Sequence, residues 1–260
     1  MTDIDDSLEV AKRAARAGAA VLRELFGSSV RVQEKVGDKG LVTEADRRAE
    51  EAILSILQKE SQFPILSEEA GLIGGAHGPR WIVDPLDGTT NFARGIPLFA
   101  VSIALVEGFD ARLGVIIDPM RGNIYCAELS RGAHIGSAAA KPQVNVDHTP
   151  ALFINHGYAE PDRLRSAEVT KRLVGHTSVR KLGSTALELA YVASGHVDAF
   201  ICSGDEFWDF AAGIAIAAEA GCLVSDWKGS AWNGSHSFVM VARPELQSML
   251  IQAVGDLQAE

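Results

Sequence analysis

The segment that most constrains the fold runs from Trp81 to Asn91, with the sequence WIVDPLDGTTN. Its short apolar start has the length of a buried strand rather than a helix, and it ends in two acids. Because Pro85 fixes its own φ and favours extended geometry at Asp84, the carboxylates of Asp84 and Asp87 can bend round one point. Two carboxylates held close repel each other or share a proton unless a cation lies between them, and oxygen ligands suit a hard ion such as Mg²⁺. The segment therefore predicts a divalent-cation site at a strand end.

The residues that follow these acids indicate a phosphate site beside the cation. Gly88 lets backbone N–H groups come close to an anion, and Thr89 offers a hydroxyl that can orient a water. The alternative is an ordinary strand-to-turn junction, since Asp, Pro and Gly are common turn residues. Such a turn requires neither two acids nor two threonines, so we interpret the segment as a site for phosphate chemistry.

Composition limits the classes of partner. The 260 residues, 47% of them hydrophobic, are enough for one large or two small domains with a core. A net charge of −10 disfavours a nucleic-acid surface, and an anionic substrate would need a metal ion to approach. No apolar run reaches the length of a membrane span, and the acidic start is opposite in charge to a signal peptide, so we expect a cytoplasmic protein without membrane contact. The three cysteines, which are widely spaced and lack a paired ligand pattern, predict reduced thiols and no zinc site: Cys126, Cys202 and Cys222.

Three further groups of acids stand at the ends of predicted elements. Glu68 and Glu69 follow a brief apolar run, one short loop before the Asp84 cluster, so neighbouring strand ends could pool their carboxylates. Asp46 lies three residues after Thr43, where it could serve as a capping-box acid or as a catalytic group. Asp209 lies in the first turn of a helix rich in small residues, as a cap or as the third corner of the acid cluster.

The pattern of strands and helices changes along the chain. Residues 99–106, 112–117, 123–129 and the region of His134 show short β-rich runs, which predict antiparallel strands after two helices, at 7–26 and from Thr43. The polar segment 139–150 predicts a boundary between an N-terminal sheet-and-helix half, residues 1–143, and an α/β half, residues 144–260. In the second half, strands and helices alternate at 152–155, from Pro161, at 178–182, 184–194, 197–201, 238–241 and from Pro244. The charged segment 33–40 predicts a mobile loop.

These motifs together resemble the inositol monophosphatase family, within the metal-dependent, lithium-sensitive phosphatases. The segments that carry the resemblance cover nearly the whole chain: Gly40–Asp46, Ser67–Glu69, Asp84–Asn91, Gly183–Ala186 and Trp208–Gly213. The resemblance implies a layered αβαβα sandwich of the inositol monophosphatase and fructose-1,6-bisphosphatase type, with an antiparallel or mixed sheet in the first half. It also implies a homodimer.

The resemblance further implies a role for each motif residue. Glu68, Asp84 and the carbonyl of Leu86 resemble the ligands of a first Mg²⁺, and Asp84, Asp87 and Asp209 those of a second, while Glu69 lies near a weaker third ion. Thr89, hydrogen-bonded to Asp46, would orient the attacking water, and the amides of Gly88 and Thr89 would hold the phosphate. The implied reaction is direct in-line hydrolysis of a phosphate monoester by a metal-activated water, without a phosphoenzyme.

The substrate pocket departs from the family pattern. Classical members have an inositol-binding glutamate seven residues before the helix-start aspartate, and here that position is Cys202. Without this glutamate the expectation of strict inositol specificity is weaker, because an enzyme selects a substrate by its hydroxyls only where polar groups of the site pair with them. Inositol monophosphate, fructose 1,6-bisphosphate, histidinol phosphate and other small polyol or sugar phosphates stay open, and Ser184, Thr185 and Asp205 are candidates for the leaving-group pocket.

Other classes of function fit less well. Aspartyl-phosphate phosphatases need two Asp separated by one residue, whereas two residues separate Asp84 and Asp87. Cysteine phosphatases need an Arg six residues after the nucleophile, and none of the three cysteines has one. Some members of the family act as binding partners of the transcription machinery, but the intact acid set argues against a purely structural role.

Overall fold

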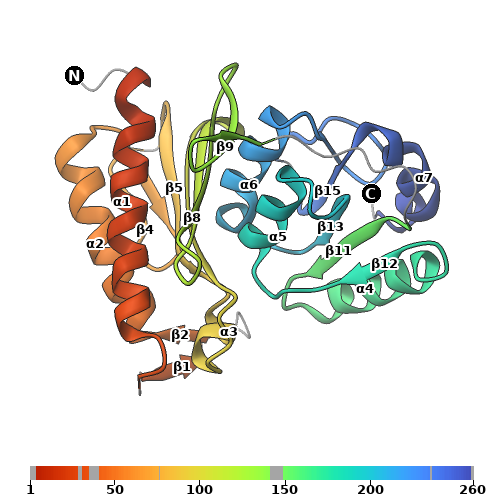
Figure 1. Ribbon diagram of the computed structural model, residues 1–260, viewed down its shortest axis with the longest axis horizontal. Coiled ribbons are helices and arrows are strands. Elements are labelled where there is room, and N and C mark those ends of the chain that lie inside the picture. The colour runs from red at the N-terminus through yellow and green to blue at the C-terminus, as the bar shows by residue number, and fades with distance from the viewer. Residues whose placement is uncertain are drawn as a thin grey trace.

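The chain forms five layers, as the computed structural model shows (Figure 1). It describes residues 4–28, 31–34, 41–75, 77–140, 149–234 and 236–258. An outer pair of helices, α1 (Ile4–Leu25) and α2 (Glu44–Glu60), covers an eight-stranded sheet, and a central pair, α5 (Thr185–Ala193) and α6 (Phe207–Glu219), lies between this sheet and a five-stranded one. The other face of the second sheet carries α4 (Glu160–Leu173) and α7 (Pro244–Val254). The predicted αβαβα sandwich is therefore confirmed.

The first sheet is mixed. Its strands are β3 (Ile65–Ser67), β4 (Gly71–Ile73), β5 (Arg80–Asp87), β6 (Ala100–Glu107), β7 (Asp110–Asp118), β8 (Asn123–Glu128), β9 (Gly132–Ile135) and β10 (Ala138–Ala139). Their order is β10-β9-β8-β7-β6-β5-β3-β4, and within the part of the chain that the structure describes, β3 and β5 form its parallel pair. This pairing sets Ser67 opposite Val83, so the residues that come next in the chain, Glu68 and Asp84, lie at the same place in the sheet.

Two segments differ from the sequence predictions. Residues 71–73, which we expected in a loop, form strand β4 against β3. Gln33 and Glu34 belong to β1 (Val32–Glu34), which pairs with β2 (Leu41–Thr43) as a hairpin. The rest of the predicted mobile loop, residues 35–40, lies outside the described residues. These strands are three residues long, too short for an alternating pattern to stand out in the sequence.

The second sheet has the order β12-β11-β13-β15-β14. Its strands are β11 (Ala151–His156), β12 (Ser178–Arg180), β13 (Ala199–Ser203), β14 (Leu223–Ser225) and β15 (Phe238–Ala242). β11 runs parallel to both β12 and β13, so Asn155 and Cys202 are direct partners near the carboxyl ends of their strands. The predicted boundary at residues 143 and 144 lies outside the described residues.

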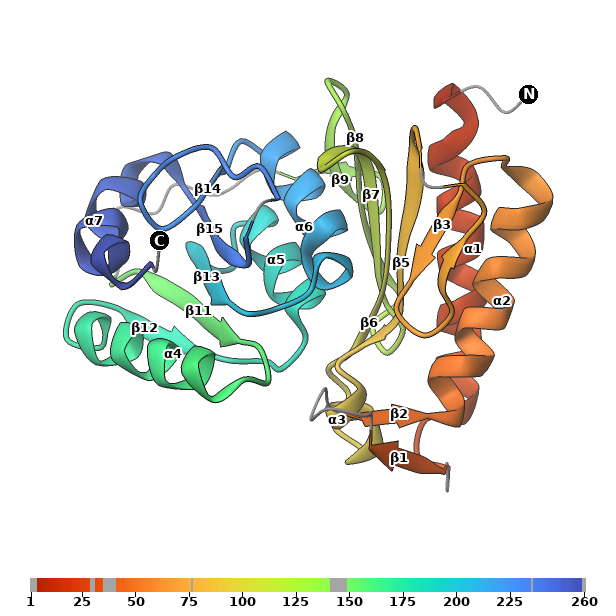
Figure 2. The same ribbon diagram turned by 180° about the vertical axis from the view of Figure 1, so that it is seen from behind.

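The central helices pack closely, α6 against the first sheet and α5 against α6, because glycines stand at the contacts. A Cβ on Gly114 of β7 would lie 2.4 Å from the carbonyl oxygen of Ala212, so only glycine lets this strand reach the backbone of α6. A Cβ on Gly213 would lie 2.5 Å from the side chain of Leu189 on α5. These approaches keep α6 packed against the first sheet, and Figure 2 shows the two from behind.

Two short helices complete the described structure. α3 (Thr89–Ala93) follows β5 directly, and the 3₁₀-helix η1 (Gly255–Leu257) follows α7. Among the helices of the described residues, none combines the length and the apolar character that crossing a bilayer requires.

Candidate metal and phosphate site

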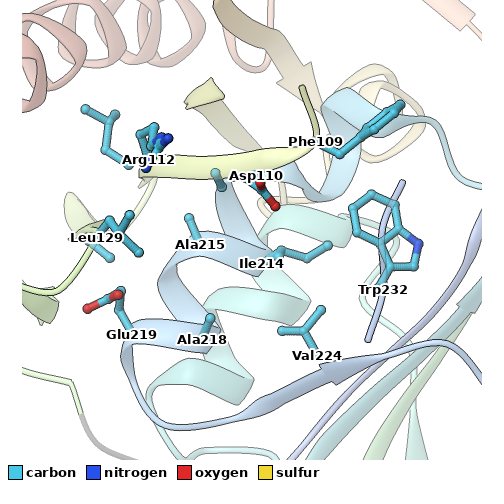
Figure 3. A pocket seen from close by; sticks show the side chains of 13 residues that line it. Phe109, Asp110, Arg112, Leu129, Ile214, Ala215, Ala218, Glu219, Val224 and Trp232 are labelled. Carbon is cyan, nitrogen blue, oxygen red and sulfur yellow. The ribbon is translucent and has the colours of Figure 1, made fainter. Parts of the chain in front are cut away.

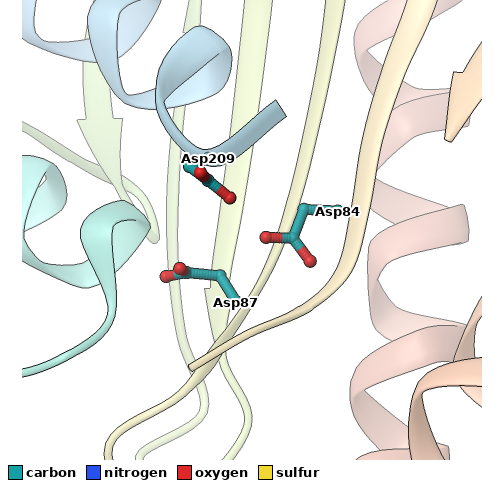
Figure 4. A group of neighbouring side chains, drawn as sticks. All are labelled: Asp84, Asp87 and Asp209. Carbon is teal, nitrogen blue, oxygen red and sulfur yellow. The ribbon is translucent and has the colours of Figure 1, made fainter. Parts of the chain in front are cut away.

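Three aspartates from two distant parts of the chain converge between the first sheet and the central helices. Figure 4 shows Asp84 and Asp87 pointing from the end of β5 towards Asp209 at the start of α6. One carboxylate oxygen from each lies within 4.8 Å of the others. Asp84 and Asp87 are buried, and Asp209 is partly buried. The convergence expected from the sequence is therefore present.

A bulge at the end of β5 turns both aspartates to the same point. Asp84 pairs with Ser102 of β6 and Asp87 with Ala100, so Pro85 and Leu86 stand opposite a single residue. The amide of Leu86 donates to Asp84 Oδ1 at 2.9 Å, which orients that carboxylate. In a regular strand without a bulge, alternation would send the side chains of residues 84 and 87 to opposite faces. The bulge explains how two acids three residues apart share one site.

Asp209 is positioned by the first turn of α6. Its Oδ2 accepts a hydrogen bond from the amide of Glu206 at 2.8 Å, which closes a capping box. The carbonyl of the neighbouring Trp208 accepts a bond from the hydroxyl of Ser102 on β6 at 3.5 Å. Asp209 is thus both a helix cap and a member of the acid cluster.

Burial and mutual repulsion raise the pKa values of the cluster. Burial raises the pKa of Asp84 well above its usual range, and the charges of Glu68, Asp87 and Asp209 raise it further. Burial and the charges of Asp205 and Glu68 do the same to the pKa of Asp209. For Asp87, burial outweighs its hydrogen bonds and raises the pKa to about 7. Without a cation, the site therefore favours protonated carboxyls.

The N-terminus of α5 holds Asp87 in place. Its carboxylate accepts bonds from the hydroxyl of Ser184, from the amide of Thr185 at 3.2 Å and from the amide of Ala186 at 2.9 Å. Ser184 is also the cap of α5 and is only 1% exposed. The structure therefore places this predicted pocket residue behind Asp87, in a position to orient it.

Thr89 and Asp46 are in contact, as the resemblance implied. The hydroxyl of Thr89 lies 3.0 Å from Asp46 Oδ1 and 3.0 Å from the carbonyl oxygen of Leu86, so its single proton can serve one acceptor at a time. The other oxygen of Asp46 accepts from the hydroxyl of Thr43 at 2.6 Å and from its amide at 2.8 Å. The sequence left capping and a role in the site as alternatives for Asp46. In the structure, Asp46 both caps α2 and contacts Thr89.

Gly88 takes a conformation that other residues adopt rarely. Its φ is +94°, and an added Cβ would lie 3.0 Å from the carbonyl oxygen of Leu98 and 3.2 Å from that of Gly183. The side chain of Asn91 ties the same elements together, because its Nδ2 lies 2.7 Å from the Leu98 oxygen and 2.8 Å from the Leu182 oxygen. The turn after Asp87 is therefore fixed by close packing.

The two glutamates after β3 approach different members of the site. Glu68 is hydrogen-bonded to Asp84 through its side chain, and its amide donates to the carbonyl of Val83 at 3.0 Å. The charge of Glu69 instead raises the pKa of Asp46, which burial brings to about 6. Both glutamates are partly buried at the edge of the acid cluster.

A polar group lies beside the cluster, at the ends of β11 and β13. The hydroxyl of Thr185 donates to Asp205 Oδ2 at 2.7 Å and lies 2.6 Å from the side-chain amide of Asn155. Asp205 is partly buried, whereas Cys202 is fully buried. Of the predicted pocket residues, Thr185 and Asp205 thus lie together, and Cys202 offers no exposed surface to a ligand.

Three residues that support the site were given no role of their own by the sequence, although Asn91 lies in the segment that ends the first motif. Glu188 is fully buried on α5, where its Oε1 accepts from the amides of Leu182 and Gly183 at 2.6 and 3.2 Å. Asn91 and Asn155 complete the set with the contacts given above. Glu188 falls on the predicted helix 184–194, and only its position among Leu and Ala residues could have marked it as a buried acid.

A separate hollow of about 150 Å³ is lined by residues of β7, by Ile214 to Glu219 of α6 and by Trp232 (Figure 3). Its lining includes the apolar side chains of Phe109, Leu129 and Ile214. None of the three clustered aspartates borders it. The hollow is therefore distinct from the acid site.

The chemistry of the donor set fits a divalent cation. Three carboxylates with oxygens within 4.8 Å of one another form a hard, negatively charged ligand set once they ionise. Their raised pKa values show that this arrangement is costly without positive charge between them. Asp84, Asp87 and Asp209 could hold a cation together, with Glu68 at the side of Asp84.

Known proteins resemble this chain along nearly its whole length. A family model described as the inositol monophosphatase family matches residues 3–259. An inositol-1-monophosphatase from Mesorhizobium japonicum is 36% identical, over 93% of this chain and 92% of that protein. A protein named Nus factor SuhB from Pseudomonas aeruginosa is 38% identical over 86% of each chain.

A solved structure extends the likeness to the fold. The extragenic suppressor protein suhB from Bartonella henselae superposes with a TM-score of 0.89 at 32% identity, over 95% of this chain and 98% of that one. The layers, the acid cluster and the match of the family model along the chain lead to one conclusion. The chain belongs to the inositol monophosphatase family.

Proposed function

We propose that this protein is a Mg²⁺-dependent phosphate monoester hydrolase that acts on inositol monophosphate or a related small polyol or sugar phosphate. The observation that carries the proposal is the convergence of Asp84, Asp87 and Asp209. Membership of a phosphatase family supports the same reaction class. A homodimer and a cytoplasmic location stay predictions from the sequence.

The site contains ligands for the metal ions and, beside them, groups that orient one of these ligands. Asp84, Asp87, Asp209, Glu68 and the carbonyl of Leu86 would hold two Mg²⁺ ions, with a third near Glu69. Bound there, the ions would acidify a water and offset the charge on the phosphate and on the leaving oxygen. The hydroxyl of Ser184 and the amides of α5 act through Asp87, because they fix the direction of its carboxylate.

Thr89 and Asp46 orient the attacking water in this proposal. The Thr89 hydroxyl can donate to Asp46 Oδ1 and still accept a hydrogen bond from a water with its lone pairs. Asp46 is held on its other oxygen by Thr43, so it does not turn away. The amides of Gly88 and Thr89 would hold the phosphate, since the positive φ of Gly88 brings the backbone round at this point.

Thr185 and Asp205 are the candidates for contacts with the leaving group. Asp205 is held by Thr185 and lies 3.4 Å from the side-chain amide of Asn155, and it is partly exposed. A carboxylate accepts hydrogen bonds, so it favours a leaving group that carries donors such as hydroxyls. Because Cys202 is fully buried, we expect a broader choice of polyol than strict inositol specificity.

A panel of phosphate esters tests the proposal. The full chain would be assayed with Mg²⁺ on inositol, fructose bis-, histidinol, glycerol and adenosine phosphates, and the esters compared by kcat/KM. We expect Mg²⁺-dependent phosphate release, fastest with a small polyol or sugar ester. If fructose 1,6-bisphosphate or histidinol phosphate has the highest kcat/KM, the protein is a fructose-1,6-bisphosphatase or a histidinol phosphatase. Release that does not depend on Mg²⁺ would contradict the mechanism.

A non-enzymatic role as a binding partner of the transcription machinery is the second candidate. Several relatives carry the name Nus factor SuhB, which favours it. Phosphate release separates the two roles, because a purely structural partner would show none with any ester of the panel. The acid cluster supports the enzyme, since bringing two buried carboxylates and a partly buried one together lowers stability unless a ligand offsets their repulsion.

A further inference from the structure

Two arginines and a glutamine gather at the β1–β2 hairpin, next to the start of α2. They line a hollow of about 360 Å³ with Val42, Thr43 and Glu44. Arg31 and Gln33 lie on the same side of the hairpin, because they are two residues apart, and Arg47 reaches them from the first turns of α2. The Arg47 guanidinium donates to Gln33 Oε1 at 3.0 Å. The hollow thus has cationic groups from two elements on a chain of net charge −10.

We propose that Arg31, Gln33 and Arg47 form a binding site for a tetrahedral oxyanion, a phosphate or sulfate group. A guanidinium presents several N–H donors in a planar fork that matches two oxygens of such an anion. One Nη of Arg47 is used by Gln33, which leaves further donors of this group for a ligand. Within the described residues, neither Arg31 nor Arg47 forms an ion pair with a carboxylate. The described side chains of the hollow thus offer hydrogen-bond donors to an anion from outside.

The described residues of the lining carry more positive than negative charge. Among them, Glu44 has a carboxylate and Arg31 and Arg47 have guanidiniums. Glu44 also begins α2, where the helix dipole favours negative charge. Removing the charge of Glu44 should therefore strengthen anion binding, whereas removing either arginine should weaken it. General electrostatic attraction would change in the same directions, so an arginine outside the hollow is needed as the control.

A chain of side-chain contacts links the hollow to the proposed active site. Thr43 lines it, and the Thr43 hydroxyl donates to Asp46, which in turn contacts Thr89. The oxyanion could be a second phosphate of the substrate or a free phosphate. Both present the same chemistry to the arginines, so kinetic measurements must separate them.

Sulfate titration of the full chain tests the site directly. The titration is done without divalent cations, so that sulfate cannot bind through a metal ion at the three aspartates. Arginine side-chain NMR signals would be followed at constant ionic strength with sodium chloride as the reference. We expect saturable shifts at Arg31 and Arg47, affinity about tenfold weaker in Arg47→Ala and Arg31→Ala, and tighter binding in Glu44→Gln.

Arg48→Ala is the matched control. Arg48 is the next residue of α2, does not line the hollow and faces Glu24 at 3.7 Å. Its removal should leave the sulfate affinity unchanged. Equal affinity in wild type and Arg47→Ala, or an absence of saturable shifts at both arginines, would overturn the proposal.

Hydrolysis kinetics identify the source of the anion, and this step alone rests on the proposed function. If the site takes a second phosphate of the substrate, Arg47→Ala should lower kcat/KM about tenfold for fructose 1,6-bisphosphate and leave glycerol phosphate unchanged. If it takes a free phosphate, both esters should keep the wild-type ratio while sulfate binding is still lost. A chain without any phosphatase activity would refute the proposed function but not the sulfate site.

Discussion

The hydroxyl of Thr89 lies 3.0 Å from Asp46 Oδ1, although 43 residues separate the two in the sequence. The contact joins the first turn of α2 to the start of α3, beside the three clustered aspartates. It brings a hydroxyl and an acid together at the edge of the proposed cation site. The outer helix layer is thereby linked to the turn that would hold the phosphate.

Thr89→Ala should reduce phosphate release strongly, whereas Thr89→Ser should retain most of it. The serine keeps the hydroxyl that contacts Asp46, and alanine removes it. Orientation and proton transfer of this kind contribute roughly 100-fold or more. Steady-state kinetics should show the loss in kcat with little change in KM. Equal rates for the alanine and serine variants would contradict the role of the hydroxyl.

Gly88→Ala should lose both activity and stability. Its φ of +94° is unfavourable for a side chain, and the Cβ would lie 3.0 Å from the Leu98 oxygen. We expect a loss of about 1–3 kcal/mol in the free energy of unfolding. Denaturant unfolding measures this loss, and Gly122→Ala is the control, because a Cβ there meets nothing within 4 Å although φ is also positive at +72°. A similar loss in both variants would show that the conformation, rather than the close approach, sets the cost.

The metal-free protein should become less stable as the pH rises. Burial raises the pKa of Asp46 from 3.8 to about 6 and that of Asp87 from 3.8 to about 7. The folded state then binds more protons than the unfolded state between these values, so the free energy of unfolding falls from about pH 4 to pH 7. Thermal unfolding in EDTA at pH 5 and pH 7.5 measures this, and the gain in Tm from Mg²⁺ should be larger at pH 7.5. A Tm in EDTA that rises over this range would contradict the prediction.

Glu188→Gln should stabilise the protein increasingly as the pH rises from 5 to 8. Burial raises the pKa of Glu188 from 4.5 to about 8, and glutamine keeps the oxygen that accepts from Leu182 and Gly183 without a charge to bury. Denaturant unfolding in EDTA gives the difference from wild type at each pH. Glu219→Gln is the matched control, since Glu219 also accepts from two amides, each at 2.9 Å, but is only partly buried. If the difference in the free energy of unfolding between Glu188→Gln and wild type does not change with pH, the prediction is wrong.

Much of the fold and the acid cluster could be predicted because each rests on a local pattern. The strand that ends in Asp84 and Asp87, and the small-residue helix that begins near Asp209, are both visible in the sequence. Their meeting could be predicted only through the family resemblance, since no local pattern relates residues so far apart. The layered fold was predicted on the same basis and is confirmed.

The parts that sequence reasoning missed are short or depend on distant contacts. β4 and β14 have three residues each, and α3 has five, too few for a period to appear. The bond from Ser184 to Asp87 joins residues 97 positions apart, so Ser184 could be read only as a pocket residue. The buried state of Cys202 likewise depends on packing around β13 rather than on its neighbours in sequence.

The most direct test of the proposed function is Mg²⁺-dependent phosphate release by Asp87→Asn, with Asp226→Asn as the matched control. Both aspartates are 7% exposed and accept hydrogen bonds, but Asp226 contacts Ser230 and Gln258 away from the cluster. We predict that Asp87→Asn loses at least about 100-fold in rate, equivalent to about 2.7 kcal/mol, while it stays folded and Asp226→Asn keeps its rate per folded molecule. Unchanged Mg²⁺-dependent hydrolysis in folded Asp87→Asn would contradict the role of the acid cluster.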